Sequence, residues 1–120
     1  MQAFLRGEYD TAIFQAFREV EVAVREAGGY SHGDLGVPLM RAAFSVPQGP
    51  LTDKAVVPAE QQAMSDLFAG AIGSFKNPAS HRSQTGIQPA EAVECIMLAS
   101  HLLRIVDERK NYNLIARSSK

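Results

Sequence analysis

The sequence predicts an all-α fold, a compact bundle of about four helices. Apolar residues recur at intervals of three and four over four stretches, the spacing that places them on one helix face. No stretch gives a convincing strand pattern. With 120 residues, of which 46% are apolar, the chain can bury roughly two-thirds of its unfolded surface. We therefore expect a single helical domain at residues 1–110 and a flexible C-terminal tail at 111–120.

The first helix is expected at residues 9–27. Two glycines at 28–29 follow it, and glycine is the residue that most often adopts the left-handed conformation ending a helix. Glu19 and Glu21 are spaced as on a solvated helix face. The buried face is expected to contain Tyr9, Ile13, Ala16, Phe17, Val20 and Val24.

A short second helix is expected at residues 37–44. Pro38 suits its first turn, because proline has no amide hydrogen to contribute there. A long loop follows at residues 45–57, near the length at which loops tend to be functional or mobile. We expect its neighbours Asp53 and Lys54 to be a solvated pair.

The third helix is expected at residues 58–76. Pro78 disfavours helical geometry at Asn77, so the chain should turn there. Lys76 falls on the flank of the helix, where its stem can lie on the protein while its ammonium reaches out. The predicted buried stripe contains Met64, Leu67, Phe68, Ala71 and Phe75.

The fourth helix is expected at residues 89–109 and is apolar over an unusually wide arc. Such a helix is central in its domain or faces a partner as well. Leu98, His101 and Ile105 form a second seam, so His101 is expected to be packed or at an interface. The main face contains Ala92, Cys95, Ile96, Ala99, Leu102, Leu103 and Val106.

Composition narrows the classes of function. The formal net charge is −1, so a polyanion would have to be held by a local basic patch, and a duplex-DNA-binding role is disfavoured. Cys95 is the only cysteine, which excludes an intrachain disulfide and fits a reducing cytosol. No apolar run approaches the ~18 residues of a membrane span, and we expect a cytoplasmic location. One cysteine and three scattered histidines give no metal-ligand spacing, so no metal or other cofactor is expected.

The residues most suited to chemistry lie at positions 75–82, where a cation, an amide and an imidazole fall within six positions. RNA can be cleaved without metal if a base takes the 2′-OH proton and an acid protonates the leaving oxygen. Histidine suits both steps, so His81 is the candidate for proton transfer. Lys76 or Arg82 could stabilise the developing charge, and Asn77 could donate to a phosphate or orient the imidazole. On spacing alone, the alternative is a loop of solvated polar residues that ends the helix.

Residues 70–82, Gly-Ala-Ile-Gly-Ser-Phe-Lys-Asn-Pro-Ala-Ser-His-Arg, resemble the signature of the HEPN superfamily: a basic residue, a polar residue and a histidine several positions on. More narrowly, the chain resembles the Ymh-type family of prokaryotic proteins of uncharacterised function. The likeness covers most of residues 5–107. Further matching stretches are residues 9–12, 16–21, 36–44, 67–71 and 99–104.

The resemblance implies a compact HEPN-like helical domain, commonly a homodimer whose two motifs face each other. It implies a metal-independent endoribonuclease or RNA-binding domain of a prokaryotic or phage defence or toxin-type system. By this resemblance His81 would be the catalytic imidazole, Asn77 its polar partner and Lys76 the phosphate cation. Apart from the resemblance, we expect Arg82 and Ser80 in the same segment to bind phosphate or RNA. The implied partners are a second copy, RNA and a cognate antitoxin or other defence protein.

The chain departs from the superfamily pattern at the basic position. Lys76 stands where most members have arginine, and an ammonium cannot make the planar two-pronged contact of a guanidinium with phosphate. The alternative is therefore a non-catalytic dimerisation or regulatory module in which the site no longer cleaves.

Overall fold

The computed structural model describes residues 2–76 and 86–118, and this part of the chain is helical with no strand. The predicted all-α class is therefore confirmed, with four longer helices and two short elements. In order they are α1 (Gln2–Leu5), α2 (Tyr9–Gly28), α3 (Gly36–Ala43), α4 (Pro58–Ala71), the π-helix η1 (Ile72–Lys76) and α6 (Pro89–Ser118).

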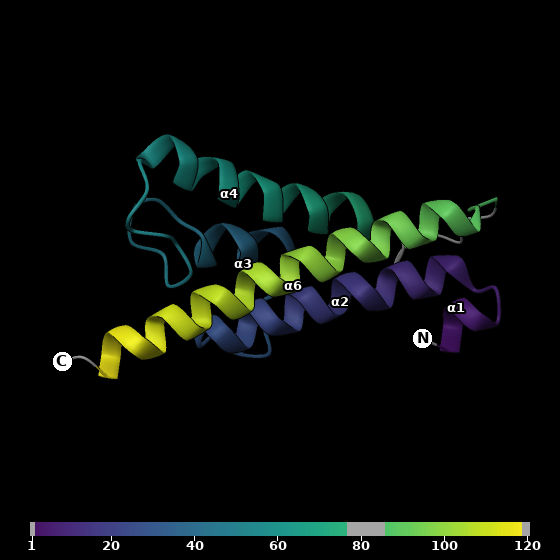
Figure 1. The fold of residues 1–120 in the computed structure, drawn as a ribbon, viewed down its shortest axis with the longest axis horizontal. Coiled ribbons are helices and arrows are strands. Elements are labelled where there is room, and N and C mark those ends of the chain that lie inside the picture. The colour runs from purple at the N-terminus through teal and green to yellow at the C-terminus, as the bar shows by residue number, and fades with distance from the viewer. Residues whose placement is uncertain (1, 77–85, 119–120) are drawn as a thin grey trace.

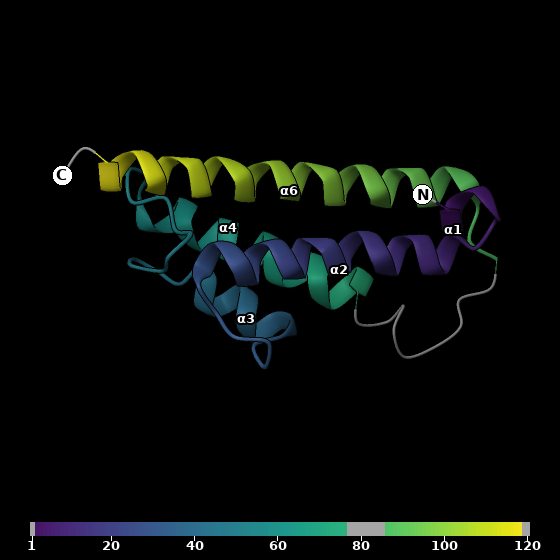
Figure 2. The same ribbon diagram turned by 90° about the horizontal axis from the view of Figure 1, so that it is seen from below.

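The long helices α2 and α6 lie side by side and run in the same direction, and α4 runs in the opposite direction (Figures 1 and 2). The molecule is elongated along this pair, with extents of 50 × 27 × 24 Å. Within the described ranges, no helix has both the length and the apolar character needed to cross a bilayer.

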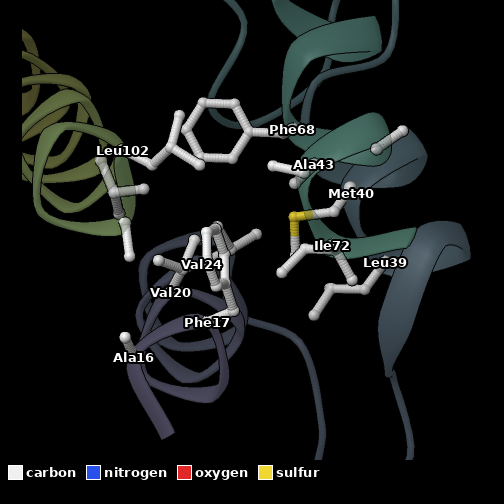
Figure 3. Close-up of a cluster of buried hydrophobic side chains, with 14 of the residues drawn as sticks. Ala16, Phe17, Val20, Val24, Leu39, Met40, Ala43, Phe68, Ile72 and Leu102 are labelled. Atoms are coloured by element: carbon white, nitrogen blue, oxygen red, sulfur yellow. The ribbon is translucent and has the colours of Figure 1, made fainter. Parts of the chain in front are cut away.

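The core lies where α2, α3, α4 and α6 meet (Figure 3). Phe44 stacks on Phe68, with ring centroids 4.2 Å apart and an interplanar angle of 24°. Phe17 is fully covered, as the three-and-four spacing of α2 predicts, and Gly29 ends that helix in the left-handed conformation at φ 74°. The largest fully buried side chains are Phe17, Val20, Val24, Leu39, Met40, Phe44, Leu51, Phe68, Ile72, Leu102 and Val106.

The buried stripe of α4 differs from the predicted one. Leu67 is 40% exposed, so its predicted burial was wrong, whereas Gln61 and Ser65 are buried. Gln61 and Ser65 hydrogen-bond to Asp53 and Arg41 respectively, so the covered face of α4 includes polar positions that an apolar pattern does not reveal.

The loop between α3 and α4 is partly exposed but is bonded to neighbouring parts of the fold. Asp53 Oδ2 lies 3.7 Å from Arg109 Nη1, and Lys54 Nζ donates to the carbonyl of Gly49 at 3.3 Å. Asp53 is therefore paired with Arg109 and not with Lys54, although Lys54 is exposed and the Asp53 side chain is 40% exposed, as the predicted solvation of both requires. The reason is that α6 runs beside this loop and supplies the counter-charge from a distant part of the sequence (Figure 1).

The last helix is longer than expected. It continues to Ser118, so the predicted end near Arg109 was wrong. Residues 110–118 contain no glycine or proline to stop a helix, and Asn113 Nδ2 donates to the carbonyl of Pro50 at 2.9 Å. A second apolar face of this helix was predicted at Leu98, His101 and Ile105. Leu98 and Ile105 are half-buried, but His101 is exposed and is therefore not packed within the chain. Its place at an interface stays a prediction.

Candidate functional site

Lys76 is the last residue of the π-helix η1, which follows α4 directly. At Ala71 the α4 backbone changes to the π-helix η1, a rare conformation that is frequent at functional sites. Ile72 is fully buried, and the Phe75 ring stacks on Phe17 with centroids 5.2 Å apart. The burial of Ile72 and the stacking of Phe75 on Phe17 hold η1 against α2 and so fix the position of Lys76.

The carboxylate that receives Lys76 is buried in the fold. Glu21 is 3% exposed, and its Oε2 accepts a 2.8 Å hydrogen bond from the backbone N–H of Gly36 at the start of α3. The same oxygen lies 3.4 Å from Lys76 Nζ, while Oε1 lies 4.0 Å from Arg25 Nη1. The prediction of a solvated Glu21 was wrong, because α3 and η1 pack over this edge of α2. One signal was present in the sequence: Glu21 follows the buried Phe17 by four positions, which puts both on the same face of the helix.

The Lys76 side chain is only 17% exposed. Its stem lies on the protein, as expected, but its ammonium turns to Glu21 instead of reaching away, so that part of the prediction was wrong. The cause is electrostatic: a buried carboxylate is costly unless it is paired and hydrogen-bonded, and Lys76 provides one of its partners.

Two cations and one carboxylate lie close together here: Arg25, Lys76 and Glu21. We call this group the α2–η1 charge cluster. The Arg25 side chain is 14% exposed and also donates from Nη1 to the backbone carbonyl of Asp34 at 3.5 Å. The Asp34 carboxylate accepts from the N–H and hydroxyl of Ser31, at 3.0 and 3.1 Å. Such a cluster can position an ammonium for an anion, since its own carboxylate does not cancel both cations.

The other predicted site residues lie outside the described residues. These are Asn77, Ser80, His81 and Arg82, so Lys76 is the one predicted site residue with a described position. Glu21 and Arg25 were not predicted as neighbours of Lys76. Their spacing of four on one helix is a signal for a side-chain pair, but nothing in the sequence brings Lys76 to them.

Neither a reactive thiol nor a metal site is found elsewhere among the described residues. Burial raises the pKa of the Cys95 thiol, and the nearby Glu91 and Glu94 raise it further, which disfavours the reactive thiolate. Among residues 2–76 and 86–118, no group of three or more His, Cys, Asp and Glu side chains is arranged to hold a metal ion.

Comparison with known proteins places the chain in a family. Neither the curated proteins nor the solved structures gave a match. A family model described as "Protein of unknown function (Hypoth_ymh)" matches residues 1–106, well over half of the chain and the part that contains the core helices and the α2–η1 charge cluster. The chain therefore belongs to the Hypoth_Ymh family of proteins of unknown function.

Proposed function

We propose that this chain is a HEPN-like domain that binds RNA and cleaves it without metal, as part of a prokaryotic or phage defence or toxin-type system. The observation that carries the proposal is the α2–η1 charge cluster. It fixes Lys76 by a 3.4 Å contact to Glu21 at the point where the chain enters the segment containing Asn77 and His81. Metal-independent phosphodiester cleavage requires a fixed cation and a group that transfers protons, and these are the roles that we propose for Lys76 and His81.

Each residue has a separate task in this proposal. His81 removes the proton of the ribose 2′-OH or protonates the leaving oxygen, and Asn77 orients it. Lys76 stabilises the charge that develops on the phosphate, while Arg82 and Ser80 bind the flanking backbone. Glu21 keeps the Lys76 ammonium in place before RNA arrives, so no ordering cost falls on the reaction itself.

A homodimer would complete the site by bringing two motifs together. On α6 (Pro89–Ser118), Val93 is 42% exposed and Met97 is 65% exposed, and their spacing of four places both on one side of the helix. Large apolar side chains on one helix favour contact with another protein surface. A second copy or a cognate antitoxin are the partners that the proposal includes, and the cytoplasm is the location.

Cleavage is tested with purified protein and a mixed RNA in EDTA. The wild-type chain should produce fragments, His81→Ala should not, and His32→Ala should cleave like wild type because His32 is an exposed loop residue. Lys76→Ala should reduce the cleavage rate, with Lys110→Ala on the exposed side of α6 as the matched control. Equal fragments from the wild type and His81→Ala, or none from any protein, would remove the enzymatic claim.

A second candidate function is a non-catalytic dimerisation or regulatory module. It is favoured by the same contact, since an incoming phosphate must compete with a buried carboxylate for the Lys76 ammonium. In this case Lys76 serves stability: Lys76→Ala lowers the urea midpoint, no RNA is cleaved, and His81→Ala leaves RNA affinity unchanged. Fluorescence anisotropy with a labelled single-stranded RNA measures that affinity, and sedimentation gives the oligomeric state.

A further inference from the structure

A second site lies at the other end of α4, away from the charge cluster. The loop after α3, the first turns of α4 and the distal part of α6 enclose a cavity of about 260 Å³. This is many times the room that one water needs, and just below the ~300–1,000 Å³ typical of sites for drug-sized ligands. The size suits a molecule of a single ring. The apolar wall consists of Phe44, Leu51, Val56, Met64 and Ile105.

One polar residue lining the cavity is Gln61, which is 5% exposed. Its Nε2 donates to the carbonyl of Asp53 at 2.9 Å, and this bond fixes which end of the amide is the oxygen. The Oε1 atom is buried and has no hydrogen-bond partner among the described residues. A buried acceptor without a donor is costly, so Gln61 is an unfavourable choice for a purely structural position.

Arg109 also lines the cavity and also has an unmatched polar atom. Its Nη1 faces Asp53 at 3.7 Å, its Nη2 donates to the carbonyl of Thr52 at 3.3 Å, and its guanidinium lies 4.8 Å from the Tyr112 ring centroid. Its Nε–H is buried and finds no acceptor in the described part of the chain. Two residues that line one cavity thus carry an unmatched acceptor and an unmatched donor. The two atoms do not bond each other, and a single group that offers both a donor and an acceptor would match the pair.

We propose that this cavity binds a small uncharged ring compound with an amide edge, that is, an N–H beside a C=O. The ligand N–H donates to Gln61 Oε1, its carbonyl accepts from Arg109 Nε–H, and its ring packs against Phe44 and Leu51. Met64 provides the adaptable part of the wall, since its unbranched side chain can move to admit the ring.

The charges around the cavity select against anionic ligands. Glu60 and Glu108 also line it, and both are exposed residues at its edge. The charge of Arg109 is already matched by Asp53. A carboxylate ligand would meet these acidic groups and could not donate to Gln61, whereas a neutral amide avoids both penalties. The site is therefore distinct in chemistry from the proposed phosphate-binding end of the molecule and does not depend on that proposal.

Benzamide is the probe, and amide-resonance titration by two-dimensional NMR is the measurement. Acetophenone, which lacks the N–H, and benzoate, which is anionic, are the matched ligands. We expect saturable shifts at the Gln61 side-chain amide and at Thr52 and Ile105, with benzamide binding at least tenfold more tightly than either control. The absence of saturable shifts, or equal affinity for benzamide and acetophenone, would overturn the proposal and leave the two polar atoms to ordered water.

Two variants locate the binding. Gln61→Met keeps the volume but removes the acceptor, so benzamide affinity should fall at least tenfold, to that of acetophenone. Gln62→Met on the exposed side of the same helix is the control and should bind like wild type. Val56→Phe should fill the cavity and abolish binding with Gln61 intact, which covers the case in which Gln61→Met does not fold. Unchanged benzamide binding in Val56→Phe would place the probe elsewhere and refute the assignment.

Discussion

Replacing Glu21 with alanine tests the structural core of the candidate site. The change removes an acceptor that holds the Gly36 N–H at 2.8 Å and the counter-ion of Lys76 at 3.4 Å. A hydrogen bond to a charged group contributes about 1.5–3 kcal/mol. The ion pair contributes less than the ~3–5 kcal/mol lost on breaking a fully buried pair, because Lys76 is 17% exposed. We expect the free energy of unfolding to fall by about 2–4 kcal/mol.

Urea unfolding followed by circular dichroism measures this loss. With a slope of ~2 kcal/mol/M, the midpoint should fall by about 1–2 M while the slope itself stays unchanged. Glu21→Gln keeps the acceptor for Gly36 but not the charge, so it should fall between Glu21→Ala and wild type. Glu19→Ala, on the exposed side of the same helix, is the control and should stay within about 0.5 kcal/mol of wild type. If Glu21→Ala costs no more than Glu19→Ala, the charge cluster does not hold α2, α3 and η1 together.

Three further predictions test the fold. Phe68→Ala should cost about 3–5 kcal/mol in urea unfolding, because the ring is fully buried and stacked, whereas exposed Leu67→Ala should cost under about 1 kcal/mol. A Cβ on Gly49 would lie 2.5 Å from the backbone nitrogen of Ser45, so Gly49→Ala should lower the melting temperature. Gly70 lies in a helix with open space around it, so Gly70→Ala should raise the free energy of unfolding by about 0.5–1 kcal/mol. Because burial raises the pKa of Cys95, its alkylation by iodoacetamide at pH 8 should be several-fold slower than that of glutathione; an equal rate would contradict this burial.

The sequence alone predicts those helices whose bounds depend on a local pattern of residues. The helix of α2 follows from apolar residues at three-and-four spacing and from the terminating glycine, and both the start at Tyr9 and the stop beside Gly29 agree with the structure. The stripe of α4 could not be predicted, since its covered face includes Gln61 and Ser65. Polar residues on a buried face are visible only once their hydrogen-bond partners are placed.

The candidate site could be predicted only in part, for a related reason. The motif draws attention to Lys76, but the partner of Lys76 is Glu21, which lies 55 positions earlier in the chain (76 − 21). Such a pair depends on how η1 packs across α2, and periodicity along one helix carries no information about it. The same holds for Asp53 and Arg109, which lie on a loop and a helix that meet only in the folded chain.

The attachment of the distal end of α6 has a consequence for native-state opening. Val106 is the last α6 residue in the buried cluster, and beyond it Arg109 and Asn113 reach the α3–α4 loop through hydrogen bonds to Thr52 and Pro50. A few polar contacts release at lower free energy than a packed core. Amide hydrogen exchange along α6 should therefore fall into two classes. Amides up to Val106 should exchange only with global unfolding, and those beyond it through a smaller, local detachment.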